Sequence, residues 1–259
     1  MTAGRVALER HGHVLAIGLD RAHKRNAFDL PLWDSLCQAY GELERDPELF
    51  VGVLHAHGDH FTGGLDLPQW TSVFASGAWA IPEGGLDPLG LTGARVTKPI
   101  VMAVQGICLT IGIELLLATD LRIVADSTRF GQIEIKRGIY PVGGATLRLP
   151  REVGWGNAMR WLLTADEFPA AEALRIGLVQ EVVPHGQQLA RALALAQTIA
   201  AQAPLGVYAT IASARAALVD EAEAGRRLLP DLAPLLASAD MQEGLAAFVQ
   251  RRPGKFSGR

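Results

Sequence analysis

Cysteine, net charge and long apolar runs are all scarce in this sequence. Only two of its 259 residues are cysteines, Cys37 and Cys108, and neither belongs to a CxxC pair or stands beside other metal-ligand residue types. The formal net charge of -3 provides no positive field for a nucleic-acid backbone, so nucleic acid is not an expected partner. No apolar run reaches the roughly 18 residues of a membrane span, and the opening segment MTAGRVALERHGHV lacks the long apolar stretch of a signal peptide. We therefore expect a reduced, cytoplasmic protein that is neither secreted nor membrane-bound.

Hydrophobic residues, by contrast, are present in the proportion of an ordinary globular protein. They make up 49% of the chain, enough for a sizeable core. Runs rich in β-branched residues alternate with helical patterns before Ala170, and alanine-rich helical patterns dominate after it. We expect an α/β core over residues 1–200 and a helical C-terminal region over residues 201–259.

Local patterns predict individual elements of this α/β core. Strands over 6–10 and 14–19 form an opening hairpin joined at His11-Gly12. Asp29 with Pro31 marks a helix start, and Asp46-Pro47 marks its end. The other expected elements are a strand over 50–54, strands over 99–104 and 121–124 that flank an apolar stretch over 107–118 as a parallel unit, and helices over 187–202, 204–218 and 221–238.

The segment 58–95 is rich in Gly, Pro and Trp and is predicted to be a long loop with about one helical turn. Loops of that length are usually functional, so we expect ligand contacts there. Its apolar side chains Leu67, Trp70, Phe74 and Trp79 either line a pocket or pack against the protein.

Glu114 stands in a strongly apolar run, IGIELLL over 111–117. On a helix its neighbours are apolar or uncharged, so burial should raise its pKa towards values useful for proton transfer. The alternative is a glutamate at the mouth of the helix that offsets the helix dipole and pairs with a distant arginine.

Glu134 is less informative from its local sequence. Polar and apolar residues alternate over 129–137, as on a half-exposed strand, and this pattern favours a solvated strand face for Glu134. Nothing in the spacing shows that Glu114 and Glu134 meet in space.

The segment His55-Ala56-His57-Gly58-Asp59-His60 has the HxHxDH spacing of metallo-β-lactamase-type hydrolases. Such dinuclear sites need further histidines downstream, and only His185 follows His60 in this chain. We therefore expect no physiological metal site here.

Five segments, in this order and spacing, resemble the crotonase superfamily of enoyl-CoA hydratases and isomerases. They are RAHKRNAF (21–28), FTGGLD (61–66), QGICLTIGIEL (105–115), RFGQIEIKRGIYPVGGATLRL (129–149) and LLTADEFPAAEALRIGLVQEVVP (162–184). The resemblance implies an α/β fold, a crotonase-like spiral of ββα units with a helical C-terminal region, assembled as homotrimers or dimers of trimers. It implies an acyl-CoA substrate and no separate cofactor, since coenzyme A is part of that substrate.

The resemblance also assigns roles to residues of this chain. The two catalytic glutamates map onto Glu114 and Glu134, and the backbone N–H groups of an oxyanion hole map onto Leu65 and Ile111. Preorganised donors of this kind stabilise the enolate charge that develops on a thioester oxygen. Residues expected at the substrate or CoA are Arg21, Lys24, Arg25, Ala27, Gly63, Gly64, Asp66, Leu67, Gly112, Pro141, Val142 and Gly143.

Retention of both glutamates is typical of hydratases, whereas isomerases usually keep only the counterpart of Glu134. The implied reaction is syn addition of water across the 2,3 double bond of a 2-enoyl-CoA, with Glu114 acting on the water and Glu134 on the α proton. The enzymatic alternatives are isomerisation of a 3-enoyl-CoA or cleavage of a thioester. A non-enzymatic alternative is a catalytically idle, oligomeric CoA-ester-binding scaffold.

Two departures from the family pattern bear on the substrate. Many hydratases have a run of glycines where this chain has Thr110-Ile111-Gly112, and a glycine where it has Val142. The added side chains should narrow or reshape the slot for the acyl group.

The phosphates of CoA require local cations, for which Arg21, Lys24 and Arg25 are the matched residues. Arg251, Arg252 and Lys255 could add to them from a neighbouring subunit, and the alternative for each is solvated surface charge.

Overall fold

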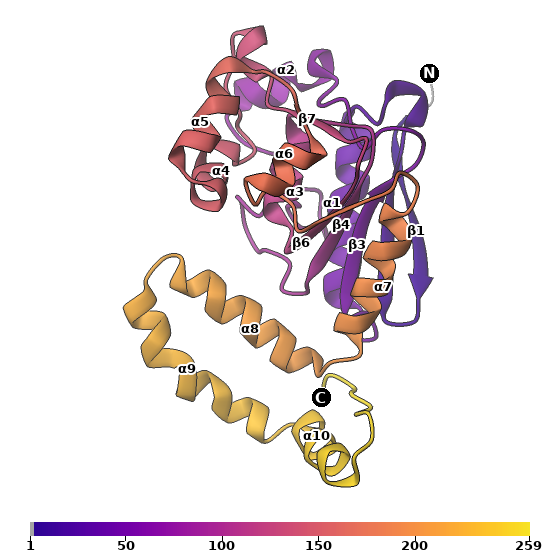
Figure 1. The fold of residues 1–259 in the computed structure, drawn as a ribbon, viewed down its shortest axis with the longest axis vertical. Helices are drawn as coiled ribbons and strands as arrows, with labels where there is room; N and C mark the ends of the chain where they lie inside the picture. Colours follow the sequence, from indigo (N-terminus) through magenta and orange to yellow (C-terminus); the bar gives the residue numbers. More distant parts are fainter. Residues whose placement is uncertain (1–2) are drawn as a thin grey trace.

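The computed structural model describes residues 3–259, and two sheets organise its α/β body (Figure 1). The larger sheet has the strand order β1-β2-β3-β4-β6-β9, and the smaller has the order β5-β7-β8. The strands are β1 Arg5–His11, β2 Val14–Asp20, β3 Val51–Ala56, β4 Ile100–Val104, β5 Ile107–Leu109, β6 Leu121–Ala125, β7 Arg129–Gly131, β8 Phe168–Pro169 and β9 Glu181–Val183. The helices are α1 Leu30–Arg45, α2 Leu67–Ser76, α3 Ile111–Ala118, α4 Ala145–Val153, α5 Trp155–Thr164, α6 Ala170–Arg175, α7 Gln188–Ala200, α8 Pro204–Ala217, α9 Glu221–Leu236 and α10 Ala239–Gln250, with short 3-10 helices at Ala22–Lys24 and Glu134–Arg137. The predicted α/β class is confirmed.

The larger sheet is covered on both faces. β1 and β2 form the predicted antiparallel hairpin, and the other neighbouring strands of this sheet pair in parallel. Helices α1 and α3 supply the core on one face, and α7 packs on the other through Ala192 and Ala196. Every residue of β3 and β4 is buried, because helices cover both faces of these parallel strands.

Helix α1 begins and ends where its local sequence predicts. The Asp29 carboxylate accepts a hydrogen bond from the Leu32 N–H at 3.0 Å, and Pro31 occupies the first turn, where its missing donor costs nothing. The helix ends at Arg45, before Asp46-Pro47.

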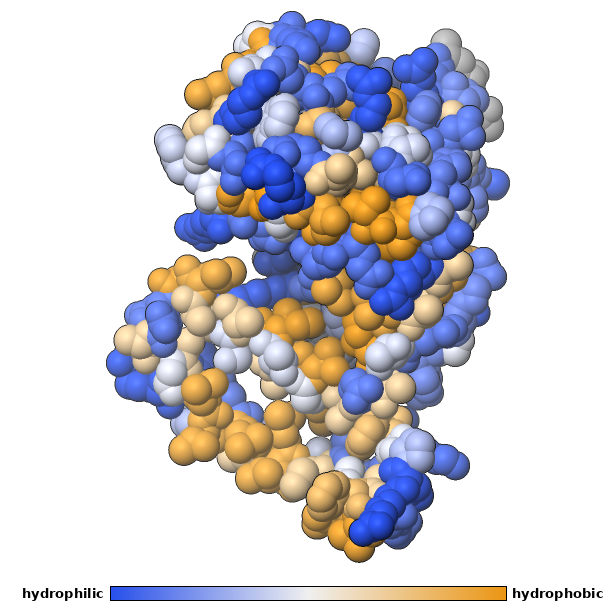
Figure 2. Space-filling model, viewed as in Figure 1, coloured by the Kyte–Doolittle hydropathy of each residue, from blue (hydrophilic) through white to orange (hydrophobic). Residues whose placement is uncertain are grey.

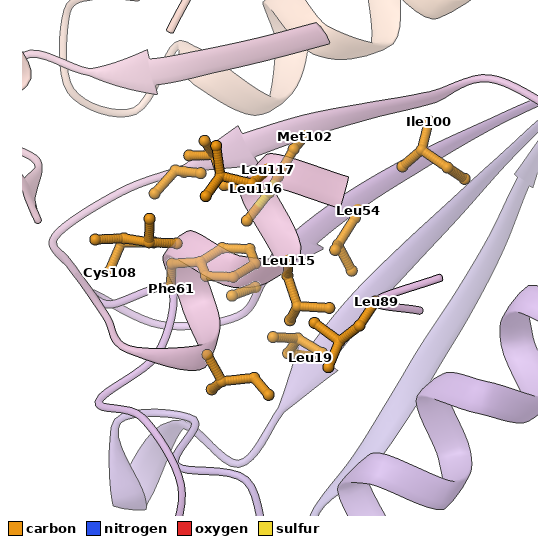
Figure 3. Close-up of a cluster of buried hydrophobic side chains, with 14 of the residues drawn as sticks. Leu19, Leu54, Phe61, Leu89, Ile100, Met102, Cys108, Leu115, Leu116 and Leu117 are labelled. Carbon is orange, nitrogen blue, oxygen red and sulfur yellow. The ribbon is translucent and has the colours of Figure 1, made fainter. Parts of the chain in front are cut away.

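The predicted strand, helix, strand unit over 99–124 is confirmed, and it forms the centre of the core. β4 and β6 pair in parallel, while the apolar stretch between them divides into β5 and α3. Figure 3 shows Leu115, Leu116 and Leu117 of α3 among side chains such as Met102 and Leu54 from the sheet. Cys108 lies in this cluster, and both cysteines are free and buried.

The prediction of a long loop over 58–95 is wrong in part, because ten of its residues form helix α2. The local signal is Asp66 followed by Leu67-Pro68, with a proline in the first turn and Gly77 ending the helix in a left-handed conformation, φ 74°. Trp70 is fully buried, and the composition of the segment therefore reflects packing as well as turns.

The strand predicted over 129–137 is also wrong beyond Gly131. β7 stops at that glycine, and residues 134–137 form a 3-10 helix that ends at Gly138, φ 75°. Glu134 is buried instead of lying on a solvated strand face.

Helices α8, α9 and α10 extend away from the α/β body as an arm (Figure 1). The three predicted C-terminal helices are confirmed as α7, α8 and α9, whereas α10 was not predicted. Its cap is a serine, Ser238, which accepts a hydrogen bond from the Met241 N–H at 3.0 Å. Figure 2 shows apolar surface along this arm. Leu228, Leu229 and Phe248 are exposed apolar side chains of α9 and α10. The division between residues 200 and 201 remains a prediction.

Within residues 3–259 no single helix has the length and apolar composition to cross a membrane. Only α7 and α8 meet those criteria together, and they are bent by 104° at the break between them.

Candidate active site

A cavity of about 170 Å³ brings together half of the site residues that the sequence singled out. Its walls come from the segment after β3, the start of α3, and the segment that follows β7. The lining residues are Gly63, Gly64, Leu65, Leu67, Phe74, Thr110, Ile111, Glu114, Ile133, Glu134, Arg137, Ile139, Tyr140 and Val142. Both predicted catalytic glutamates and both predicted oxyanion positions are therefore at one site.

The Leu65 N–H is positioned by a short backbone pairing with Phe28. The Phe28 N–H donates to the Gly64 carbonyl at 2.8 Å, and the Asp66 N–H donates to the Phe28 carbonyl at 2.9 Å. Because alternate residues of an extended segment point their backbone groups to opposite sides, the Leu65 N–H faces away from Phe28. It donates to no other group within residues 3–259, so it is available to a ligand in the cavity.

The Ile111 N–H is the first donor of helix α3, and it too has no acceptor among the described residues. Thr110, which precedes Ile111, is held in place because its N–H donates a hydrogen bond to the Gly131 carbonyl at 2.9 Å. Thr110 takes the unusual backbone angles φ 51° and ψ -113°, a region that glycine adopts more easily. A free donor at a helix N-terminus favours negative charge next to it.

Glu114 lies in the first turn of α3 and is 3% exposed. Its Oε1 accepts hydrogen bonds from the Gly143 N–H at 2.7 Å and the Ala145 N–H at 3.2 Å. Burial raises the pKa of Glu114 to about 7, although these hydrogen bonds and the charge of Arg148 act in the opposite direction. Glu114 thus lies at the start of the helix, as the alternative of a dipole-compensating glutamate expected. Its direct partners, however, are backbone donors and not an arginine.

Glu134 is the first residue of the 3-10 helix and is 9% exposed. Its pKa is raised to about 7, mainly by burial and to a smaller extent by the nearby charge of Glu114. Within residues 3–259 its Oε2 has no hydrogen-bond partner, so this oxygen is available to exchange a proton with a ligand. Two carboxyl groups that titrate near neutral pH thus share one cavity.

Several lining residues were not identified from the sequence, Arg137, Ile139 and Tyr140 among them. On the predicted strand, Arg137 would have pointed away from Glu134. In the 3-10 helix, residues three apart lie on the same side, and Arg137 therefore reaches the cavity. The signal that could have revealed this turn is Gly138, which ends it.

The Arg21 guanidinium is already paired within the protein, and its predicted role at CoA stays a prediction. Its side chain is 4% exposed, with Nε 3.0 Å from Asp29 Oδ2 in an ion pair and Nη1 hydrogen-bonded to Asp66 Oδ2 at 3.0 Å. Asp66 is thus a partner of Arg21, and its predicted contact with the substrate stays a prediction. The pair joins the 21–28 segment to the start of α2.

The other residues predicted to contact the substrate or CoA lie partly at the surface and partly inside the protein. Lys24 and Arg25 are exposed, and the Arg25 carbonyl accepts a hydrogen bond from the Gly63 N–H at 2.8 Å, so the backbone of Arg25 lies beside the cavity's glycine loop. Ala27 is half-buried in the same segment, and Pro141 and Gly112 are buried. The C-terminal cations Arg251, Arg252 and Lys255 are exposed, and Arg252 is paired with Glu243.

The histidine motif forms no metal centre among residues 3–259, where no group of three or more metal-ligand side chains is suitably arranged. His55 is buried at the end of β3, where its pKa is lowered to about 4, mainly by burial and to a smaller extent by the neighbouring His57. His60 Nδ1 accepts a hydrogen bond from the Ile107 N–H at 3.3 Å.

Comparison with known proteins gives one consistent result. Residues 9–259 match the family described as enoyl-CoA hydratase/isomerase. An enoyl-CoA hydratase of Mycobacterium tuberculosis is 35% identical over 97% of this chain and 96% of its own length. A mevalonyl-coenzyme A hydratase of Aspergillus fumigatus is 32% identical over 93% of this chain and 90% of its own.

Solved structures agree with the sequence comparisons. A probable enoyl-CoA hydratase/isomerase from Mycobacterium abscessus is 48% identical and superposes with a TM-score of 0.96 over 100% of both chains. An enoyl-CoA hydratase from Mycobacterium tuberculosis is 35% identical, with a TM-score of 0.88 over 98% of this chain and 99% of that one. The predicted crotonase-like fold with a helical C-terminal region is confirmed.

Proposed function

Because the chain belongs to the enoyl-CoA hydratase/isomerase family, we propose that it is an enoyl-CoA hydratase, which adds water syn across the 2,3 double bond of a 2-enoyl-CoA. The observation that carries this proposal is the pair of buried carboxyl groups, Glu114 and Glu134, that line one cavity with two available backbone donors. The thioester is the substrate, and coenzyme A enters as part of it.

The thioester carbonyl accepts hydrogen bonds from the N–H groups of Leu65 and Ile111. As water adds at the β carbon, electron density moves to this oxygen, and an enolate develops. Preorganised donors in a site shielded from water stabilise that charge, each typically worth about 10²–10³ in rate. The helix dipole of α3 acts in the same direction at Ile111.

Glu114 positions the water and takes a proton from it while the water oxygen bonds to the β carbon. Glu134 gives its proton to the α carbon on the same face. These two roles require that, at neutral pH, one glutamate is a carboxylate and the other a carboxylic acid. Two interacting carboxyl groups whose pKa values both lie near 7 share one proton in this way. Each acid/base role contributes roughly 10²–10⁴ in rate.

We also propose that the protein is a cytoplasmic homo-oligomer of three or six chains. Exposed leucines and Phe248 on α9 and α10 support a homotrimer or dimer of trimers, because such a surface is costly in contact with water. Two free, buried thiols are in keeping with a cytoplasmic setting. Light scattering on the purified protein should give the mass of three or six chains.

The function is tested by incubating the protein with crotonyl-CoA and identifying the product by mass spectrometry. Hydration predicts loss of the enoyl absorbance and formation of 3-hydroxybutyryl-CoA. Double-bond migration in a 3-enoyl-CoA without any hydration would indicate an isomerase, and binding without turnover would indicate a scaffold. We expect turnover to survive exhaustive chelation, since catalysis is assigned to carboxyl and backbone groups alone.

A further inference from the structure

We propose that the natural substrate carries a bulky, apolar acyl group, much larger than crotonyl, and that the part beyond the double bond occupies a second cavity of about 530 Å³ next to the catalytic one. This inference rests on the proposed function and specifies the substrate class of that site. It depends on the size, the adjacency and the lining of the two cavities.

The catalytic cavity by itself has room for little more than the reacting atoms. A water molecule occupies about 30 Å³ in the liquid, so 170 Å³ is space for about six atoms of that size. The sulfur, the carbonyl oxygen and the four carbons of a crotonyl thioester fill that space. Any longer acyl group must continue into a neighbouring space.

The second cavity provides that space, because the two cavities share part of their walls. Phe74, Ile139, Tyr140 and Val142 line both, so the two cavities are neighbours that meet at these four side chains. With about 530 Å³, the second cavity has the size of sites that hold drug-sized ligands, roughly 300–1,000 Å³. A crotonyl group would leave it unused.

The lining of the second cavity selects apolar groups. It consists of Val73, Phe74, Gly77, Ala78, Trp79, Gly138, Ile139, Tyr140 and Val142, with no charged side chain. Arg137 lines the catalytic cavity but not this one. An acyl tail with an ionised group would lose its hydration here without a partner of opposite charge.

The aromatic wall of this cavity is held in place by packing behind it. Trp79 lies against Trp33 with ring centroids 4.9 Å apart, and Trp33 Nε1 donates to the Ala80 carbonyl at 2.9 Å. Trp70 contacts both indoles edge-on and donates to the Phe28 carbonyl at 2.8 Å. A wall fixed before binding does not lose conformational entropy when a large ligand enters.

The proposal is tested on the wild-type protein with crotonyl-CoA, 2-decenoyl-CoA and 3-cyclohexylpropenoyl-CoA. One additional methylene in an apolar pocket is worth about 10–200-fold in selectivity. We therefore expect kcat/KM for at least one of the two larger esters to exceed that for crotonyl-CoA by about 10-fold or more. Equal or better turnover of crotonyl-CoA would overturn the inference and leave the hydratase function intact, whereas no hydration of any ester would overturn the function itself.

A matched pair of variants tests the location of the acyl tail. Ala78 lines only the second cavity, whereas Ala75 is exposed on α2 and lines neither. Ala78→Phe should lower the ratio of kcat/KM for the preferred large ester over crotonyl-CoA by about 10-fold, and Ala75→Phe should leave that ratio as in the wild type. An unchanged ratio in well-folded Ala78→Phe would contradict this location. If Ala78→Phe does not fold, Val142→Gly, which widens the shared wall, should change the same ratio, and no change would count against the proposal.

Discussion

The Gly143 N–H donates a hydrogen bond of 2.7 Å to Oε1 of Glu114, and the absence of a side chain at Gly143 is what permits this approach. A Cβ at that position would collide with the carboxyl group of Glu114. The glycine thus holds the carboxyl in the orientation that faces the cavity.

Gly143→Ala should therefore displace the Glu114 carboxyl and lower kcat by about 10², because a shift of about 1 Å in a reacting group has an effect of that size. Gly156→Ala is the matched control, since a Cβ there meets no atom within 4 Å and the residue lies on the exposed helix α5. We expect steady-state kinetics of the control to match the wild type. Normal kcat in Gly143→Ala would show that the contact has no role in catalysis.

The raised pKa of Glu114 has a consequence for stability. Between about 4.3, the unfolded value, and about 7, the folded chain holds a proton that the unfolded chain releases. Stability falls as pH rises through this window, by about 1.4 kcal/mol per unit while only the folded state is protonated, or about 4 kcal/mol in all. The Glu114→Gln variant has no ionisable group at this position, so it does not lose stability in this way as the pH rises.

Urea unfolding at one protein concentration measures this effect. The free energy of unfolding of Glu114→Gln minus that of the wild type should increase by about 3 kcal/mol between roughly pH 5 and pH 8. A difference that does not change with pH would mean that Glu114 has an ordinary pKa.

Activity should also depend on pH in a definite way. Glu114 and Glu134 are coupled and titrate as a pair, and the reaction requires the form that carries one proton. We predict a bell-shaped profile of kcat/KM with its maximum near pH 7, measured between about pH 5 and pH 9. A flat profile across that range would be incompatible with this acid/base pair.

Substitution of Arg21 and substitution of Arg25 should have different effects on stability and on the binding of CoA esters, although both residues were expected to contact CoA. Arg21→Gln leaves the buried carboxylate of Asp29 without its cation, which typically costs about 3–5 kcal/mol of stability. Arg25 is exposed, so Arg25→Gln should raise KM for CoA esters with little change in Tm. A loss of CoA affinity without loss of stability in Arg21→Gln would reverse this assignment.

Elements with local signals could be predicted from the sequence, and those that depend on distant partners could not. Helix α1 carries its own cap at Asp29, and the β-branched runs of β4 and β6 have one obvious pairing. Residues 129–137, by contrast, alternate like a strand, and only the end of β7 at Gly131 and the turn at Gly138 convert them into a 3-10 helix. The proximity of Glu114 and Glu134 follows from the parallel pairing of Leu109 with Gly131, which brings the residues after both strands to the same edge.

The burial of Arg21 could not be predicted either. One of its two partners, Asp66, lies 45 residues away, and a cluster of basic residues in the sequence gives no sign of such pairing. The roles of Glu114 and Glu134, in turn, came from the family resemblance, and their pKa values came from the burial that the fold imposes.

The central claim is the division of labour between the two glutamates, and the most direct test is hydration of crotonyl-CoA by Glu114→Gln and Glu134→Gln. Glutamine keeps the size and hydrogen bonding of the side chain but cannot exchange a carboxyl proton. Both variants must first be shown to bind acyl-CoA and to keep the wild-type oligomeric state. Glu114→Gln should then lose roughly 10²–10⁴ in hydration rate and keep measurable proton exchange at the α carbon, whereas Glu134→Gln should lose both. Near wild-type hydration by a well-folded Glu134→Gln variant would contradict the account.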